Sequence, residues 1–207
     1  MLGILTGLAE EAKLAARAFP EAKIALSYAQ EEQGRRALQA LLRAGATELL
    51  SFGCAGGLDP TLQPGAIIVP DYVYDAGKKI SCDGAMRKRF GAGKVHGGGI
   101  FHSSVMIGTA EQKRQICKET GCCAVDMESG IVAQSGLPFA VLRVICDDAS
   151  RDLPPAAASG LKNGKIFLPG LIGSLFRRPS QLGALMQLGK EAGRARRSMA
   201  DFLRDIL

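Results

Sequence analysis

The stretch FAVLRVICD, residues 139–147, decides the fold of this chain. Apolar and β-branched residues fill it, which is typical of a buried strand, and an acid ends it. Further runs of this kind occupy residues 2–6, 23–28, 48–52, 66–70 and 101–107, and helical patterns alternate with them at 9–18, 31–44, 110–120 and 127–135. The alternation predicts a mostly parallel sheet wrapped by helices.

The chain has the size and composition of one domain. Its 207 residues, 47% of them hydrophobic, suffice for a substantial core, and we predict a single domain over 1–207. The apolar runs are far shorter than the about 20 residues that cross a bilayer. The first residues lack the basic flank of a signal peptide. We therefore expect a cytoplasmic protein.

The net charge of +6 is concentrated near the C-terminus, where basic residues dominate from 177 to 204. Aromatic residues make up only 5% of the chain, which is too few for a base-stacking platform, so no nucleic-acid partner is predicted. The six cysteines fall mostly in apolar stretches and do not have zinc-ligand spacing. We interpret them as reduced, buried thiols.

Two segments depart from the alternation. Residues 75–103 are polar and glycine-rich, which indicates an irregular insertion or a hairpin and loop over the sheet edge. Residues 166–176 are apolar but broken by Pro and Gly, and they precede a predicted basic amphipathic helix from 180 to 207. The region 166–207 could lie on an anionic membrane surface. The alternative is a terminal helix that packs on the domain with its basic face in solvent.

Small or polar groups follow the apolar runs at four places, where α/β folds build their ligand crevices. They are Glu11, the glycine turn 54–57, the pair Asp126 and Glu128, and Asp147. Each has an ordinary structural explanation by itself, because acids also favour the first turn of a helix or cap a turn. Together they predict one site for a polar, hydroxyl-rich substrate.

In this order the segments resemble the purine and uridine phosphorylase superfamily, which includes the methylthioadenosine/S-adenosylhomocysteine nucleosidases. GILTGLAEE at 3–11 is similar to the nucleosidases' opening strand and acidic turn, and CAGGL at 54–58 to their glycine turn. VDME at 125–128 is close to their ribose motif, and RVICD at 143–147 matches the strand that ends in their catalytic aspartate. With DLPPA at 152–156, the chain is most similar to the hopanoid-associated phosphorylase group.

This resemblance implies a three-layer α/β/α sandwich with a mixed, mostly parallel central sheet. It also implies cleavage of the base–sugar bond of an adenosyl-type nucleoside, through an electron-poor, oxocarbenium-like sugar. Asp147 would protonate the leaving base, helped by a pKa that desolvation can raise, and Glu11 would activate water. The implied substrate-binding residues are Glu128, Met127, Asp126, Val125, Cys54, Ala55 and Gly56.

The nucleophile stays open between water and phosphate, which is a possible co-substrate. Cys54 replaces the hydroxyl that the phosphorylases offer to phosphate, and Ser51 stands where the hexameric enzymes carry a phosphate-binding arginine. Glu11 favours water. No metal or redox cofactor is implied. The only histidines, His96 and His102, are predicted to have loop or surface roles.

Three functions of different kinds remain. The leading one is release of adenine from adenosylhopane, a lipid-linked nucleoside, in hopanoid side-chain biosynthesis. The second is a nucleosidase for methylthioadenosine, S-adenosylhomocysteine or small purine nucleosides. The third is a non-catalytic nucleoside-binding module. The resemblance also implies a homo-oligomer.

Overall fold

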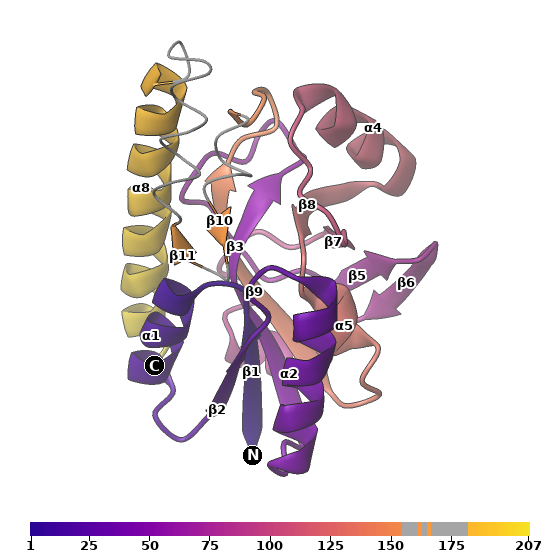
Figure 1. The fold of residues 1–207 in the computed structure, drawn as a ribbon. Helices are drawn as coiled ribbons and strands as arrows, with labels where there is room; N and C mark the ends of the chain where they lie inside the picture. Colours follow the sequence, from indigo (N-terminus) through magenta and orange to yellow (C-terminus); the bar gives the residue numbers. More distant parts are fainter. Residues whose placement is uncertain (155–160, 163–164, 167–181) are drawn as a thin grey trace.

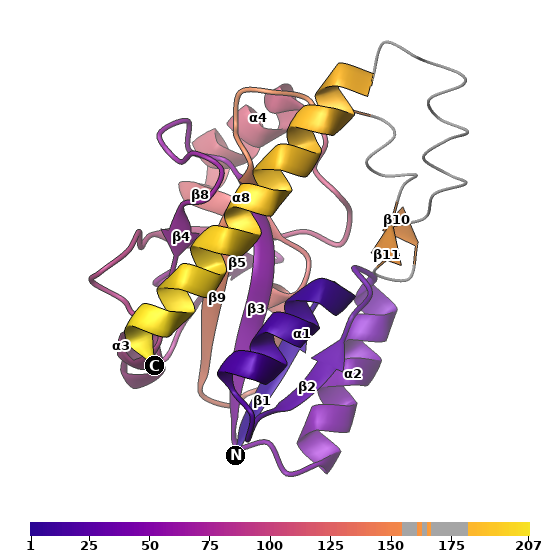
Figure 2. The same ribbon diagram turned by 90° about the vertical axis from the view of Figure 1, so that its left-hand side faces the viewer.

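The computed structural model describes residues 1–154, 161–162, 165–166 and 182–207. In this part of the chain a nine-stranded sheet lies between two layers of helices (Figures 1 and 2). The strands are β1 Leu2–Thr6, β2 Lys23–Leu26, β3 Glu48–Gly57, β4 Ile67–Ile68, β5 Tyr72–Asp75, β6 Lys78–Ser81, β7 Gly99–His102, β8 Cys122–Asp126 and β9 Phe139–Asp147, with a separate pair β10 Leu161–Lys162 and β11 Lys165–Ile166. The helices are α1 Ala9–Ala18, α2 Glu31–Arg43, α3 Gly84–Arg89, α4 Ala110–Thr120, α5 Ser129–Ala133 and α8 Leu182–Ile206.

The sheet is mixed and mostly parallel, as the resemblance implied. Its order is β2-β1-β3-β8-β7-β5-β6, and β9 joins it beside β3 and also pairs with β4. The pairs β3–β8, β4–β9 and β5–β6 are antiparallel, whereas the other pairs of this sheet are parallel. A register shift between Ala55 and Gly56 places Gly56 opposite both Val125 of β8 and Asp147 of β9. The ends of β3, β8 and β9 therefore meet at one place.

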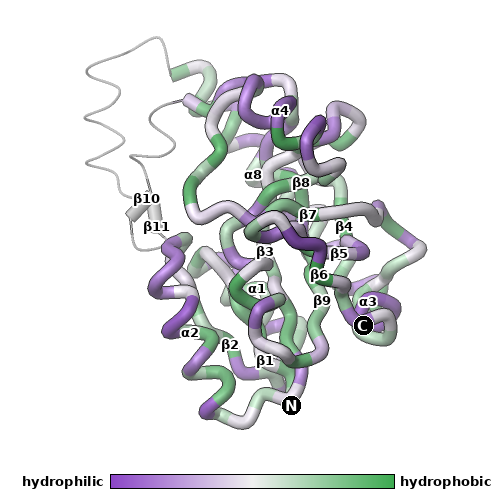
Figure 3. The backbone as a smooth tube through the Cα atoms, turned by 90° about the vertical axis from the view of Figure 1, so that its right-hand side faces the viewer, coloured by the Kyte–Doolittle hydropathy of each residue, from purple (hydrophilic) through white to green (hydrophobic). Residues whose placement is uncertain are grey.

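Each face of the sheet has its own apolar core, because successive strand residues point to opposite faces. Helices α1 and α8 cover one face, where Ile4, Leu50 and Leu142 are buried with Met199 and Leu203 of α8. Helices α2 and α5 cover the other face, over a second cluster in which alternate residues of the same strands, Leu5, Leu49 and Val141, pack with Leu38 of α2 and Ile131 of α5. Figure 3 shows the hydrophobic character of β8 and β9 against the hydrophilic stretches of α4. The three-layer arrangement is thus confirmed.

Helix α8 packs on the domain through its C-terminal half, where Ala195, Met199 and Leu203 are buried. Its first turns are more open, since Leu182 and Met186 are exposed. None of the described helices is long and apolar enough to cross a membrane. The packing of α8 agrees with the second interpretation of the basic helix given above. Apart from residue 166, the predicted apolar segment 166–176 lies outside the described residues.

Some expectations about local structure need correction. The strand predicted at 101–107 is β7, which ends at His102 because Ser103 turns the chain with hydrogen bonds to Val105. The helix predicted at 127–135 is the shorter α5, since Glu128 has non-helical dihedrals at its N-cap. Of the two alternatives for residues 75–103, the hairpin at the sheet edge is confirmed, because β5–β6 forms that edge, and α3 follows it.

Candidate active site

Glu11 lies at the start of α1 and turns back over the end of β1. One carboxylate oxygen accepts hydrogen bonds from the Thr6 hydroxyl at 2.7 Å and the Leu8 N–H at 2.8 Å, as a capping acid does. The other accepts the Cys54 N–H of β3 at 2.7 Å. A carboxylate offers about four lone-pair positions. Glu11 therefore joins the ends of β1 and β3 and keeps capacity for one further donor.

Glycine at position 53 makes this approach possible. Its φ of +144° lies in the region that L side chains rarely adopt, and a Cβ there would stand 2.6 Å from the Glu11 carboxylate. Residues 54–57, predicted as a glycine turn, are instead the last part of β3. A backbone N–H group next to a glycine can still bind an anion. At Cys54 this N–H group is taken by the protein's own carboxylate. The Cys54 thiol does not supply an anion, because a hydrogen bond with Cys146 and burial raise its pKa well above the usual value.

A buried arginine holds the second carboxylate of the site. Arg143, on β9, is only 1% exposed, and its guanidinium donates to the Cys54 carbonyl at 3.1 Å and the Ser51 hydroxyl at 2.7 Å. It also pairs with Glu128 at 3.1 Å and with Asp126 at 2.6 Å. Burial disfavours the charged guanidinium, but these two carboxylates outweigh it and raise the pKa of Arg143. The Cys54 peptide is thus held by Glu11 on its N–H and by Arg143 on its carbonyl.

Glu128 is the N-cap residue of α5, without a capping hydrogen bond from its side chain, and its carboxylate faces Gly7 after β1. Its second oxygen accepts the Ser27 hydroxyl at 2.7 Å, and a Cβ on Gly7 would stand 3.0 Å from that oxygen. Burial raises the pKa of Glu128, and the charge of Arg143 offsets part of the rise. Asp126 is more enclosed, because its side chain has no exposed surface and Ser129 donates to it. Asp126 would therefore act on a ligand through Arg143 rather than by contact.

Asp147 ends β9 and is held by a lysine. Gly56 leaves room beside it, so that a Cβ on Gly56 would stand 3.5 Å from both carboxylate oxygens. The ammonium of Lys113, on α4, lies 2.5 Å from one of these oxygens. Burial raises the pKa of Asp147, and Lys113 offsets part of that rise. Gly56 is two residues beyond Cys54, which is about 7 Å along a strand. Asp147, beside Gly56, is therefore separated from the Cys54 N–H that Glu11 binds by about 7 Å, a distance that a small ligand can span.

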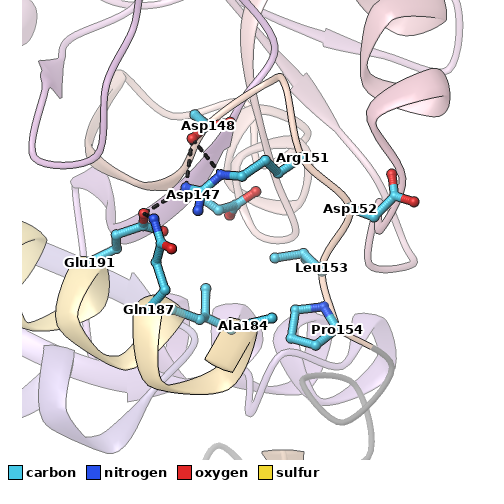
Figure 4. A pocket seen from close by; sticks show the side chains of 10 residues that line it. Asp147, Asp148, Arg151, Asp152, Leu153, Pro154, Ala184, Gln187 and Glu191 are labelled. Atoms are coloured by element: carbon cyan, nitrogen blue, oxygen red, sulfur yellow. Dashed lines mark hydrogen bonds and ion pairs between the residues drawn. The ribbon is translucent and has the colours of Figure 1, made fainter. Parts of the chain in front are cut away.

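A cavity of about 300 Å³ opens beside Asp147 (Figure 4). Its apolar lining residues are Leu153, Pro154, Ala184 and Leu188, and its polar lining residues are Asp147, Asp148, Arg151, Asp152, Gln187 and Glu191. Arg151 lies between the loop after β9 and α8, with its guanidinium 2.6 Å from Asp148 and 2.5 Å from Glu191 of α8. The loop after β9 is thereby tied to α8, and α8 forms part of the cavity.

The remaining predicted site residues have different surroundings. Val125 is buried against the Gly56 position, and Met127 is half-buried between the two acids of its motif. The Ala55 side chain points into the core, so that only its backbone could meet a ligand. The structure thus joins Glu11 directly, and Glu128 through Arg143, to the backbone of Cys54, with Asp147 beside Gly56.

Sequence reasoning missed three residues of this arrangement. Lys113 is fully buried. The sequence signal for this burial was its position on the same helix face as Ala110, which is also buried. His102 was predicted to have a loop or surface role, but it is buried, with its ring 3.2 Å from Glu31 and 4.0 Å from Asp126. Ser27 holds Glu128 across 101 positions of sequence, which no local pattern indicates. In the described residues, no cluster of three or more His, Cys, Asp or Glu side chains could hold a metal ion.

Comparison with known proteins bears on the fold. The family model described as "Phosphorylase superfamily" matches residues 28–92. The chain has the fold of the phosphorylase superfamily. This superfamily resemblance, stated above on the four motifs, is thereby confirmed. No curated protein sequence matches the chain.

Solved structures with the superfamily fold include three nucleoside-cleaving proteins. The 5'-methylthioadenosine/S-adenosylhomocysteine nucleosidase of Helicobacter pylori, with butyl-thio-DADMe-Immucillin-A, is 18% identical at a TM-score of 0.68 and covers 99% of this chain and 96% of its own. The futalosine hydrolase of Helicobacter pylori is 18% identical at 0.67, with the same coverage. The S-adenosylhomocysteine nucleosidase of Streptococcus pyogenes, with 5-methylthiotubericidin, is 17% identical at 0.67, again with 99% and 96% covered.

Proposed function

We propose that the protein cleaves the N-glycosidic bond of an adenosyl-type nucleoside and releases adenine. The observation that carries this proposal is that Glu11 binds the Cys54 N–H and Arg143 links Glu128 to the Cys54 carbonyl, with Asp147 beside Gly56. An oxocarbenium-like sugar is electron-poor, and carboxylates close to it lower the barrier through charge. Resemblance to the nucleosidases supports the same chemistry.

Asp147 is the general acid in this proposal. When the bond from the anomeric carbon to the base breaks, its electron pair moves to the base, which takes up the Asp147 proton. A raised pKa favours the protonated carboxyl that this step needs, and the Asp147 carboxyl is part of the cavity wall. Glu128 accepts hydrogen bonds from the ribose hydroxyls, and the half-buried Met127 covers the sugar ring.

Water, rather than phosphate, is the nucleophile. Phosphate would have to bind next to the Glu11 carboxylate, which already takes the Cys54 N–H, and like charges repel at this distance. Ser51 is fully buried, and its hydroxyl oxygen accepts a hydrogen bond from Arg143, so it faces the protein interior rather than a bound anion. Glu11 has room for one more hydrogen bond and accepts the proton of the attacking water.

The substrate carries a large apolar group at its 5′ position, as adenosylhopane does. Leu153, Pro154, Ala184 and Leu188 offer apolar surface beside Asp147, and the motifs quoted in the sequence analysis resemble those of the hopanoid-associated group. Methylthioadenosine is the alternative substrate, because the neighbours with this fold include nucleosidases of methylthioadenosine.

The test is incubation of the full chain with adenosylhopane, methylthioadenosine or adenosine, with and without phosphate. Chromatography then detects adenine, and mass spectrometry separates free sugar from sugar 1-phosphate. Adenine and free sugar at equal rates with and without phosphate are expected. Asp147→Asn should lose about a hundredfold or more in kcat while it still binds the nucleoside, and Asp201→Asn on the outer face of α8 serves as control.

Other results would replace parts of the proposal. A phosphate-dependent sugar 1-phosphate would overturn water as the nucleophile. Methylthioadenosine turnover far above that of adenosylhopane would favour the small-substrate nucleosidase. Binding of the nucleosides without release of adenine under any of these conditions would leave a binding module and overturn the enzyme.

Contact with a membrane belongs to the same proposal. Leu182 and Met186 are exposed, one turn apart at the start of the basic helix α8, and an apolar lipid substituent would reside in such a membrane. Flotation with anionic liposomes tests this, using the double variant Leu182→Asp with Met186→Asp, and Leu207→Asp as matched control. Recovery of the unchanged chain in the soluble fraction would overturn the contact. The cytoplasmic location and homo-oligomer stay predictions, the latter open to light scattering.

A further inference from the structure

Lys113 is a buried charge that the proposed reaction does not yet use. Its side chain has no exposed surface, which is rare for lysine unless the ammonium is paired. The ammonium contacts one Asp147 oxygen at 2.5 Å, the Asp148 carbonyl at 2.6 Å and the Arg151 carbonyl at 3.3 Å. A lysine ammonium has three N–H donors. Lys113 has therefore used its donors on the protein and reaches a substrate only through Asp147.

The contacts of Lys113 link three parts of the fold. It lies on α4, whose start is fixed by the Thr109 capping box and by Asp152, which accepts the Ala110 N–H at 2.8 Å. The carbonyls that it holds belong to the loop after β9, which Arg151 ties to α8. Movement of Lys113 would thus turn the Asp147 carboxyl and release the loop that bounds the cavity.

We propose that Lys113 is the positioning residue of Asp147: it fixes one carboxyl oxygen, and its charge stabilises the carboxylate left after proton donation. The proposal rests on the proposed function and names a residue for that reaction. As the base departs, the Asp147 proton moves to it and the Asp147 oxygen becomes negative beside the ammonium. Water returns the proton before the next turnover. The other Asp147 oxygen is the one directed to the substrate.

Among the charged groups around Asp147, Lys113 is the cation that stabilises its carboxylate. Asp148 and Glu191 face Asp147 as acids and raise its pKa, whereas Lys113 lowers it. Arg151 pairs with both of these acids. Burial raises the pKa of Asp148, but hydrogen bonds from Arg151 and Ser150 outweigh this effect and bring the pKa of Asp148 to about 2. The pair Asp148 and Arg151 is therefore close to neutral. Removal of the Lys113 charge would leave Asp147 buried among acids.

The test compares Lys113→Gln, which loses the charge, with Lys113→Arg, which keeps it. An opposite charge at this distance lowers a carboxyl pKa by about 1–3 units, so Lys113→Gln should raise the Asp147 midpoint by that amount. In Lys113→Arg, the Asp147 midpoint should stay within about half a pH unit of that of the unchanged chain. This variant should lower kcat more than it changes KM. Lys118→Gln, an exposed site on the same helix, should match the unchanged chain.

Two readouts separate this proposal from the function it rests on. The pH profile of kcat/KM should extend to higher pH in Lys113→Gln, because the acid form of Asp147 persists there. Carbon-13 NMR of labelled aspartate carboxyls, assigned with Asp147→Asn, measures the same midpoint without any turnover. A shifted NMR midpoint in an inactive protein would keep the pairing and overturn only the function.

The opposite results overturn the proposal itself. An unchanged midpoint in Lys113→Gln, with lower thermal stability alone, would make Lys113 a structural residue. If Lys113→Gln does not fold, Lys113→Arg decides the matter: a midpoint shift of one unit or more, or equal changes in kcat and KM, would refute the role.

Discussion

Replacement of Arg143 by methionine tests the charge network that holds the site. Methionine keeps the length and apolar stem of the side chain but removes the guanidinium. The side chains of Asp126 and Glu128, 0% and 5% exposed, then lose their cation. Removal of one partner from a buried ion pair costs about 3–5 kcal/mol. For a domain of this size, that corresponds to a fall in Tm of about 6–20 °C.

The pH dependence gives this prediction a sign. Burial already raises the pKa of Glu128 above its unfolded value, and loss of Arg143 removes a charge that lowers it. A folded state with a raised carboxyl pKa binds more protons than the unfolded state, so its stability falls as pH rises. The Tm deficit of Arg143→Met should therefore be smaller at pH 5 than at pH 8.

Calorimetry of both proteins at the two pH values measures the effect. Arg36→Met is the matched control, since Arg36 and Glu32 form an exposed pair at 68% and 76% exposure. Such surface pairs contribute little, and a change in Tm under about 2 °C is expected. A Tm for Arg143→Met as close to the original as that of the control would refute the reasoning. A deficit independent of pH would refute its electrostatic part.

The remaining predictions concern Gly53 and the side chains of Glu11 and Ser51 near it. Gly53→Ala should lower Tm and abolish activity because its Cβ would meet the Glu11 carboxylate, whereas Gly45→Ala, also at positive φ but with no atom within 4 Å, carries only backbone strain; similar melting curves would contradict this. Glu11→Gln should lower kcat about a hundredfold or more with little change in KM, and the exposed Glu10→Gln should not; equal kinetics would count against Glu11 as the base. Ser51→Ala removes a buried acceptor and should cost about 1–3 kcal/mol in urea unfolding, and a smaller loss would show that the arginine finds another partner.

The strands that carry the site were predictable because apolar residues dominate their runs. The run predicted at 139–146 forms β9, which continues to Asp147. The strand predicted at 101–107 was wrong in its end, because hydrophobicity alone does not reveal a turn. Ser103 forms hydrogen bonds with the backbone of Val105, two residues further on, and β7 ends before it. A strand pattern therefore locates the buried segment better than its end.

The network inside the site was not predictable from local sequence. Ser27 and Glu128 are far apart in the chain, and so are Lys113 and Asp147. Pairing of a buried lysine with an acid is set by how α4 packs over β9, which depends on the whole fold. The motifs indicated which acids matter, but not which cations hold them.

The uneven burial of α8 has a consequence for solvent access. Its later turns, with Ala195, Met199 and Leu203, are sealed against the sheet, while its early turns rest mainly on the bridge from Arg151 to Glu191. A helix anchored at one end frays from the other, so amide hydrogens near 184–190 should exchange with deuterium well before those near 195–203. Brief unwinding of the first turns would then wet the Asp147 carboxyl while the interior stays dry.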